Sequence, residues 1–124
     1  MTISSPTQAD PTWMERFNAG DIEGLLELYE PDALFVPEPG AKPLAGPDAV
    51  RDFAANFPLQ DPQIDLRTRV IYERDRDALV YSDWTMTGTG PDGPTRLEGQ
   101  ATVVLRKQSD GRWLLAVDDP FTQR

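Results

Sequence analysis

The chain has 124 residues, a length that buries one hydrophobic core and hardly two. Its formal net charge of -9, from 21 acidic and 12 basic residues, disfavours nucleic acid and anionic membrane surfaces as partners. The absence of histidine and cysteine excludes His-activated nucleophiles, disulfides and the usual zinc-ligand spacings. We therefore expect no metal and no cofactor, and any acid–base chemistry would fall to carboxylates, tyrosines or lysines with shifted pKa values.

The polar residues 1–10 predict a flexible N-terminal arm, and residues 11–124 a single domain. Residues 1–10 have no basic or strongly apolar stretch typical of a signal peptide, and no segment approaches the roughly 20 apolar residues of a membrane span. The sequence thus predicts a soluble cytoplasmic protein with no membrane partner.

Two helices are expected first. Asp10 is predicted as the N-cap of a helix that starts at Pro11 and runs to about Asn18, and Asp21 as the N-cap of a second one running to about Tyr29. A short apolar strand follows at residues 33–36, and then a loop rich in proline and glycine at residues 37–47.

A third helix begins near Pro47, because Val50, Phe53 and Phe57 follow at helical spacing. The second half of the chain has a period of two, which is typical of strands. Polar or glycine-containing turns separate four strands, which predict an antiparallel meander: residues 64–73, 78–87, 96–107 and 112–118. Three helices followed by long strands favour an α+β fold in which a strongly bent antiparallel sheet wraps around the helices.

Both faces of this sheet carry apolar side chains. Leu97, Ala101 and Val103 point one way, and Val104 points the other way with Thr102. One face would cover the helices and a pocket, so the outer face would need a second cover, and we expect a homodimer formed through it. The alternative is a monomer whose sandwich is completely filled.

Several segments resemble the nuclear transport factor 2-like superfamily, and more narrowly its ketosteroid isomerase-related branch. They are FNAGD (17–21), LLELY (25–29), DA (32–33), Gly46 with AVR (49–51), VYSDWT (80–85), DGRW (110–113) and AVDDP (116–120). The resemblance spans about residues 11–121. It implies a cone-shaped roll that encloses an apolar pocket, in a superfamily that includes isomerases, cyclases, dehydratases and non-enzymatic binders.

The family's catalytic residues are not retained in this chain. Its catalytic tyrosine corresponds to Trp13, its base aspartate to Pro37, and the acid of its oxyanion hole to about Thr102. The resemblance therefore implies the pocket without classical ketosteroid isomerisation. Glu38, next to the position of the missing base, is a candidate replacement from the Pro-rich loop.

Alternation along the strands, combined with the resemblance, predicts which side chains face the pocket. Asp118 and Glu98 are the candidate catalytic carboxylates, because burial near tryptophan would raise the pKa of either one. The alternatives are a solvent-exposed Glu98 and an Asp118 bonded to a helix N-terminus or to Arg106. Ala116 is expected to face inward as well. The predicted ligand-binding residues are Trp13, Phe17, Tyr29, Phe53, Ser82, Trp84, Met86, Gln100, Thr102 and Val104.

These residues predict binding of a small apolar or aromatic metabolite, with cofactor-free proton transfer of the isomerase, cyclase or dehydratase type. The alternative is a non-catalytic module for ligand binding or dimerisation, which the missing family residues favour. A protein–protein adaptor is a third possibility, supported only by the expected fold and the acidic composition.

Overall fold

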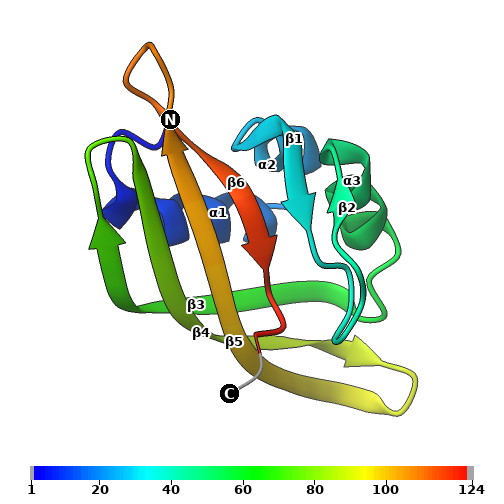
Figure 1. Cartoon of the computed structure of the whole chain (residues 1–124). Helices are drawn as coiled ribbons and strands as arrows, with labels where there is room; N and C mark the ends of the chain where they lie inside the picture. The colour runs from blue at the N-terminus through cyan, green and yellow to red at the C-terminus, as the bar shows by residue number, and fades with distance from the viewer. Residues whose placement is uncertain (1, 123–124) are drawn as a thin grey trace.

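The computed structural model describes residues 2–122; Met1, Gln123 and Arg124 lie outside the described residues. Three α-helices, α1 (Ala9–Asn18), α2 (Ile22–Leu26) and α3 (Pro47–Ala55), lie on one side of a six-stranded sheet (Figure 1). The strands are β1 (Tyr29–Phe35), β2 (Leu44–Ala45), β3 (Gln60–Glu73), β4 (Asp77–Gly90), β5 (Gly93–Lys107) and β6 (Trp113–Asp119). The α+β class and the antiparallel meander of β3 to β6 are confirmed.

The strand order is β2-β1-β6-β5-β4-β3. β1 runs parallel to β6 and the other neighbours are antiparallel, so the sheet is mixed rather than purely antiparallel. The long strands β3, β4 and β5 bend strongly, and the sheet curls toward α1 without closing into a barrel (Figure 1). Register shifts in β3 and β6 accompany this curvature, as expected of β-bulges.

The second helix ends earlier than predicted. α2 stops at Leu26, and Tyr29 begins strand β1 instead of closing the helix. Pairing with β6 explains the difference, because the Leu28 carbonyl accepts from the Leu115 amide at 2.8 Å and Tyr29 lies opposite Leu115 in the parallel ladder. The Pro-rich segment predicted as a loop also contains the two-residue strand β2, which pairs with the end of β1.

The described residues 2–10 differ from the expected loose arm, because they pack against the sheet. Ile3 is 1% exposed, and its carbonyl accepts a hydrogen bond of 2.8 Å from the Trp113 amide. A short 3-10 helix, η1 (Pro6–Gln8), then leads directly into α1. Asp10 consequently lies inside the first turn of α1 and is not its N-cap.

The side chain of Asn18 fixes the end of α1 to β3. Its Nδ2 donates to the Ile64 carbonyl at 2.9 Å, and its Oδ1 accepts from the Ile64 amide at 2.7 Å. β3 is the edge strand of the sheet, so these two bonds satisfy backbone groups beside which no further strand lies, and they hold α1 to this edge.

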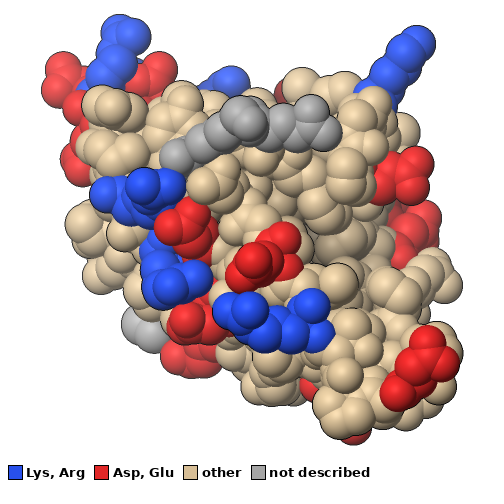
Figure 2. All heavy atoms as spheres, turned by 90° about the horizontal axis from the view of Figure 1, so that it is seen from below, with Lys and Arg blue, Asp and Glu red and all other residues tan. Residues whose placement is uncertain are grey.

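Charged side chains are interleaved on the surface. Arg67 pairs with Asp65 at 3.6 Å and Arg69 with Asp83 at 3.5 Å. Figure 2 shows acidic and basic groups side by side on the lower face of the molecule, so neither sign forms a broad patch there. In the described part of the chain, no helix is long and apolar enough to cross a membrane.

Candidate functional site

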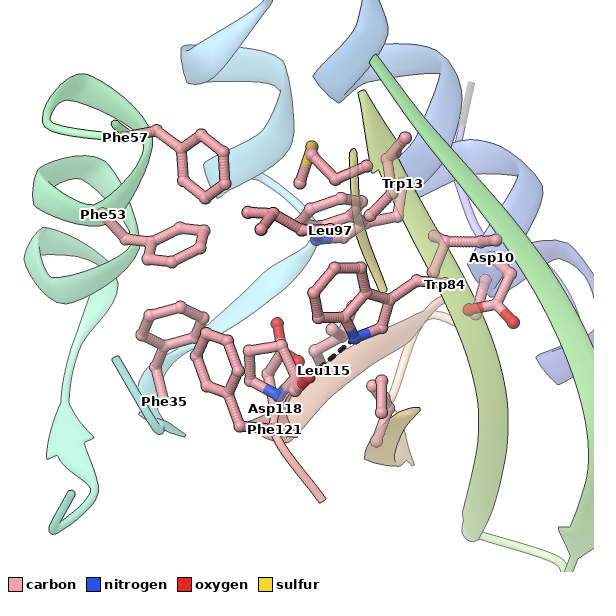
Figure 3. Close-up of a pocket in the computed structure, with 17 residues that line it drawn as sticks. Asp10, Trp13, Phe35, Phe53, Phe57, Trp84, Leu97, Leu115, Asp118 and Phe121 are labelled. Carbon is pink, nitrogen blue, oxygen red and sulfur yellow. Dashed lines mark hydrogen bonds between the residues drawn. The ribbon is translucent and has the colours of Figure 1, made fainter. Parts of the chain in front are cut away.

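A cavity of about 90 Å³ lies between α1, α3 and the concave face of the sheet (Figure 3). Ring side chains form much of its wall, and most of the remaining lining is aliphatic. Two carboxylates, Asp10 and Asp118, also reach the lining. The rings are those of Trp13, Phe35, Phe53, Phe57, Trp84 and Phe121.

The phenylalanine rings form one side of the cavity. Phe53 on α3 makes edge-to-face contacts with Phe35 and Phe57, at centroid distances of 5.2 and 5.3 Å. Phe121, which follows β6, makes further edge contacts with Phe53 and Trp84. Because edge-to-face pairs add stability beyond burial alone, this side of the cavity is well defined.

Trp84 forms the opposite side, and its position depends on a glycine of the neighbouring strand. Gly99 is its cross-strand partner, and a Cβ atom at position 99 would lie 2.5 Å from the indole Cζ2. Only glycine therefore leaves room for the ring to lie flat on β5. The indole Nε1 donates to the Pro120 carbonyl at 2.7 Å, which fixes the ring and the segment after β6 together (Figure 3).

Asp118 is held by a chain of hydrogen bonds behind the cavity. The Tyr29 hydroxyl donates to its Oδ2 at 2.5 Å, and Trp13 Nε1 donates to the Tyr29 oxygen at 2.8 Å. Since Tyr29 accepts from Trp13, its own proton is directed to Asp118. Asp118 is 5% exposed. Its partner is thus Tyr29, and Arg106 instead pairs with Glu30 at 3.7 Å.

Burial raises the pKa of Asp118 to about 7. The hydrogen bond from Tyr29 opposes this shift, and the charges of Asp119 and Asp10 add to it. Burial and the Asp118 charge together raise the pKa of Tyr29 well above its ordinary value, so Tyr29 stays protonated as a donor. Asp118 is therefore divided between its acid and base forms near neutral pH, which is the condition for general acid–base catalysis.

Asp10 is a second buried carboxylate, which the sequence pattern predicted only as a helix cap. It is 8% exposed, and its Oδ2 accepts hydrogen bonds from Thr68 Oγ1 at 2.6 Å and from Ser82 Oγ. Thr68 and Ser82 are direct partners across β3 and β4. Thr68 and Ser82 could have served as the sequence signal, because two buried hydroxyls that face each other across neighbouring strands need a hydrogen-bond acceptor nearby.

The predicted orientation of β5 is wrong. Leu97, Ala101 and Val103 line the cavity, and the alternate residues lie on the outer face. Glu98 is exposed and pairs with Arg96 at 3.3 Å. The other three predicted site residues of β5 also face outward: Gln100 bonds to Asp83, Thr102 bonds to Thr122, and Val104 pairs with Leu79 and Val117. Alternation separates the two faces of a strand but does not say which one is inside.

A β-bulge in β6 decides which of its residues reach the cavity. Val104 pairs with Val117 and Leu105 with Leu115, so Ala116 is the extra residue without a partner. Leu115 and Asp118 consequently share the inner face although they are three residues apart. The predicted inward alternation of Ala116 with Asp118 therefore fails at Ala116.

The remaining predicted site residues lie at or behind the cavity, except Glu38. Trp13, Phe53, Trp84 and Met86 line it. Phe17, Tyr29 and Ser82 are buried behind this lining: Phe17 stacks on Trp13 with ring centroids 5.1 Å apart, Tyr29 bonds to Asp118, and Ser82 bonds to Asp10. Glu38 is exposed and is not among the lining residues.

Solved structures resemble this chain over nearly its whole length. A conserved protein from Planctomyces limnophilus has a TM-score of 0.81 and 20% identity, with 93% of this chain and 91% of that chain covered. A ketosteroid isomerase-like protein from Erwinia carotovora atroseptica has a TM-score of 0.77 and 21% identity, with 91% and 89% covered. At these identities the likeness establishes the fold alone.

A further similar structure is an NTF-2 like protein of unknown function from Shewanella oneidensis, with a TM-score of 0.72, 18% identity, and 91% and 93% of the two chains covered. No curated protein matches the sequence. The model of the SnoaL-like domain matches residues 12–116, which include Trp13, Tyr29 and the inner faces of β3 to β5. The chain therefore belongs to the SnoaL-like domain family and has the nuclear transport factor 2-like fold.

Proposed function

We propose that the cavity binds a small molecule with an apolar ring, and that Asp118 transfers a proton to or from it without a cofactor. The observation that carries the proposal is a carboxyl group, 5% exposed, at the wall of an aromatic cavity. Its pKa of about 7 suits a group that gives and takes protons near neutral pH.

Tyr29 and Trp13 act as positioning residues in this proposal. The Tyr29 hydroxyl occupies Asp118 Oδ2, which leaves Oδ1 for a ligand. Trp13 orients that hydroxyl through its indole N–H and also presents its ring to the cavity. A fixed carboxylate avoids reorganisation during the reaction, which lowers the barrier to proton transfer.

The size of the cavity limits the ligand. A dry cavity of roughly 150 Å³ admits benzene in another protein, so a cavity of about 90 Å³ fits no more than one ring without movement of side chains. A larger molecule would extend past Leu97, which lines the cavity and is 38% exposed. The ligand class is therefore a single ring, or a ring attached to a tail that reaches solvent.

A non-catalytic binding module is the second candidate. Trp13 and Pro37 occupy the positions that correspond to the tyrosine and the base of ketosteroid isomerases. Glu98, the other predicted catalytic carboxylate, faces solvent and offers no replacement. The two candidates differ in one respect: the enzyme needs the proton of Asp118, and the binding module does not.

A simple carbon acid, used as a test substrate, distinguishes the enzyme from the binding module. With isoxazole, which is a single ring, a base removes the C3 proton while the N–O bond breaks, and the enolate of cyanoacetaldehyde is released with the proton left on the base. We expect the wild-type protein to accelerate this reaction, and Asp118→Asn to lower the rate by about 10²-fold or more. The rate should rise with pH through about 7, because the carboxylate form of Asp118 is the base, with pKa about 7.

Two further variants make this test specific. Glu98→Gln, an exposed carboxylate changed in the same way, should leave the rate unchanged. Tyr29→Phe removes the hydrogen bond that lowers the pKa of Asp118, so the midpoint of the pH profile should move upward. Equal rates for the wild type and Asp118→Asn would reject proton transfer and leave the binding module.

A further inference from the structure

We infer that the cavity selects ring compounds that carry a hydrogen-bond donor, organic ammonium ions above all, and rejects carboxylates. This inference rests on the proposed binding function and names its ligand class. It follows from two observations: carboxylate oxygens that can accept hydrogen bonds line the cavity, and the side-chain donors around it are already bonded within the protein.

The side-chain hydrogen-bond donors around the cavity are bonded to other groups of the protein. The Trp13 indole N–H is donated to Tyr29, and the Trp84 indole N–H to the Pro120 carbonyl. The Tyr29 hydroxyl is donated to Asp118. Both hydroxyls beside Asp10 are donated to that carboxylate. A ligand that only accepts hydrogen bonds therefore finds no side-chain donor free in this set.

The acceptors are available. Each carboxylate uses Oδ2 for the bonds above, and among residues 2–122 no side chain donates to Oδ1 of Asp10 or Asp118. In the same part of the chain, no fully buried side-chain oxygen lacks a partner. Both Oδ1 atoms therefore keep some accessible surface, and both residues line the cavity. An ionised carboxylate accepts hydrogen bonds and donates none.

Charge adds to this preference. Neither lysine nor arginine occurs among the described residues that line the cavity, so an anion would meet carboxylates without a compensating cation. A cation would meet carboxylates and the faces of aromatic rings, which attract positive charge. The mixed lining of rings and carboxylates therefore suits an organic ammonium ion best. A neutral alcohol or phenol is the second-best ligand.

Three ligands of nearly equal shape test the inference: benzylamine, benzyl alcohol and benzoate. Calorimetric titration at pH 8 should give the order benzylamine, benzyl alcohol, benzoate, with at least a tenfold loss of affinity at each step. Between pH 8 and pH 5 the affinity for benzylamine should fall at least tenfold as Asp118 takes up a proton, while that for benzyl alcohol changes little. The titratable groups that face Asp118 are Asp10 from α1, Tyr29 from β1 and Asp119 from β6.

Two variants locate the effect. Asp118→Asn and, separately, Asp10→Asn should each reduce the preference for benzylamine over benzyl alcohol, whereas Asp83→Asn on the outer face should preserve it. If a variant fails to fold, the pH series with the wild type still measures the contribution of the Asp118 charge. Benzyl alcohol binding as tightly as benzylamine would overturn the inference and leave the proposed binding function standing. Absence of binding by all three ligands would overturn both.

Discussion

At the scale of one residue, Asp118 is a buried carboxylate whose ionised form destabilises the folded state. An ionised carboxylate buried without a basic partner costs free energy, and the Tyr29 hydroxyl offsets only part of this cost. The pKa of the group is about 7 in the folded chain, against 3.8 for the unperturbed side chain. The folded state therefore holds this proton more tightly than the unfolded state does.

The contribution of Asp118 to stability is consequently lost as the pH rises from about 4 to about 7, and it stays lost above that. A shift of about three pKa units corresponds to about 4 kcal/mol. We predict that Asp118→Asn is more stable than the wild type at pH 8, by up to this amount, and that the difference shrinks to less than half of its pH 8 value at pH 5. Urea unfolding at the two pH values measures it. The exposed control variant Glu98→Gln should show no such dependence, and an Asp118→Asn difference independent of pH would contradict the prediction.

At the scale of elements, the sequence predicted where the strands lie along the chain better than which face of each strand is buried. Alternation and turn residues located the four strands of the meander, because these signals are local. The inner face of β5 depends on what packs against it, and both of its faces carry apolar residues, so Glu98 was placed inside wrongly. The bulge at Ala116 and the burial of Asp10 arise from contacts between distant segments, which period and propensity do not encode.

The junction of α1 with β3 belongs to this scale and positions one wall of the cavity. Asn18→Ala removes both hydrogen bonds to Ile64, so the backbone amide and carbonyl of Ile64 lose these partners. We predict a loss of about 1–3 kcal/mol in the free energy of unfolding, measured by urea titration. Asn56→Ala is the matched control, because the exposed Asn56 bonds only to the Asp52 carbonyl of its own helix, and it should cost far less. Equal losses for both variants would contradict a specific role for this junction.

At the scale of the whole molecule, the outer face of the sheet carries an apolar row across four strands. Leu79 pairs with Val104, Val104 with Val117, and Val117 with Leu34. These side chains are half-buried or exposed, and Leu34 is 39% exposed. A row of this kind favours a partner surface, since contiguous apolar patches on soluble proteins often mark interfaces. We propose that a second copy of the chain covers it, as a two-fold dimer.

The dimer is tested by placing a charge in the middle of the row. The wild type should sediment at micromolar concentration as twice the 13.9 kDa chain, and Val104→Glu as a single chain, because it puts two unpaired carboxylates into a desolvated interface. Leu44→Glu is the matched control: Leu44 is 49% exposed on the edge strand β2, outside the row, so this variant should remain dimeric. Near-UV circular dichroism like that of the wild type would show that Val104→Glu still folds. A wild-type protein that sediments only at 13.9 kDa would reject the dimer and leave the apolar row as ordinary surface.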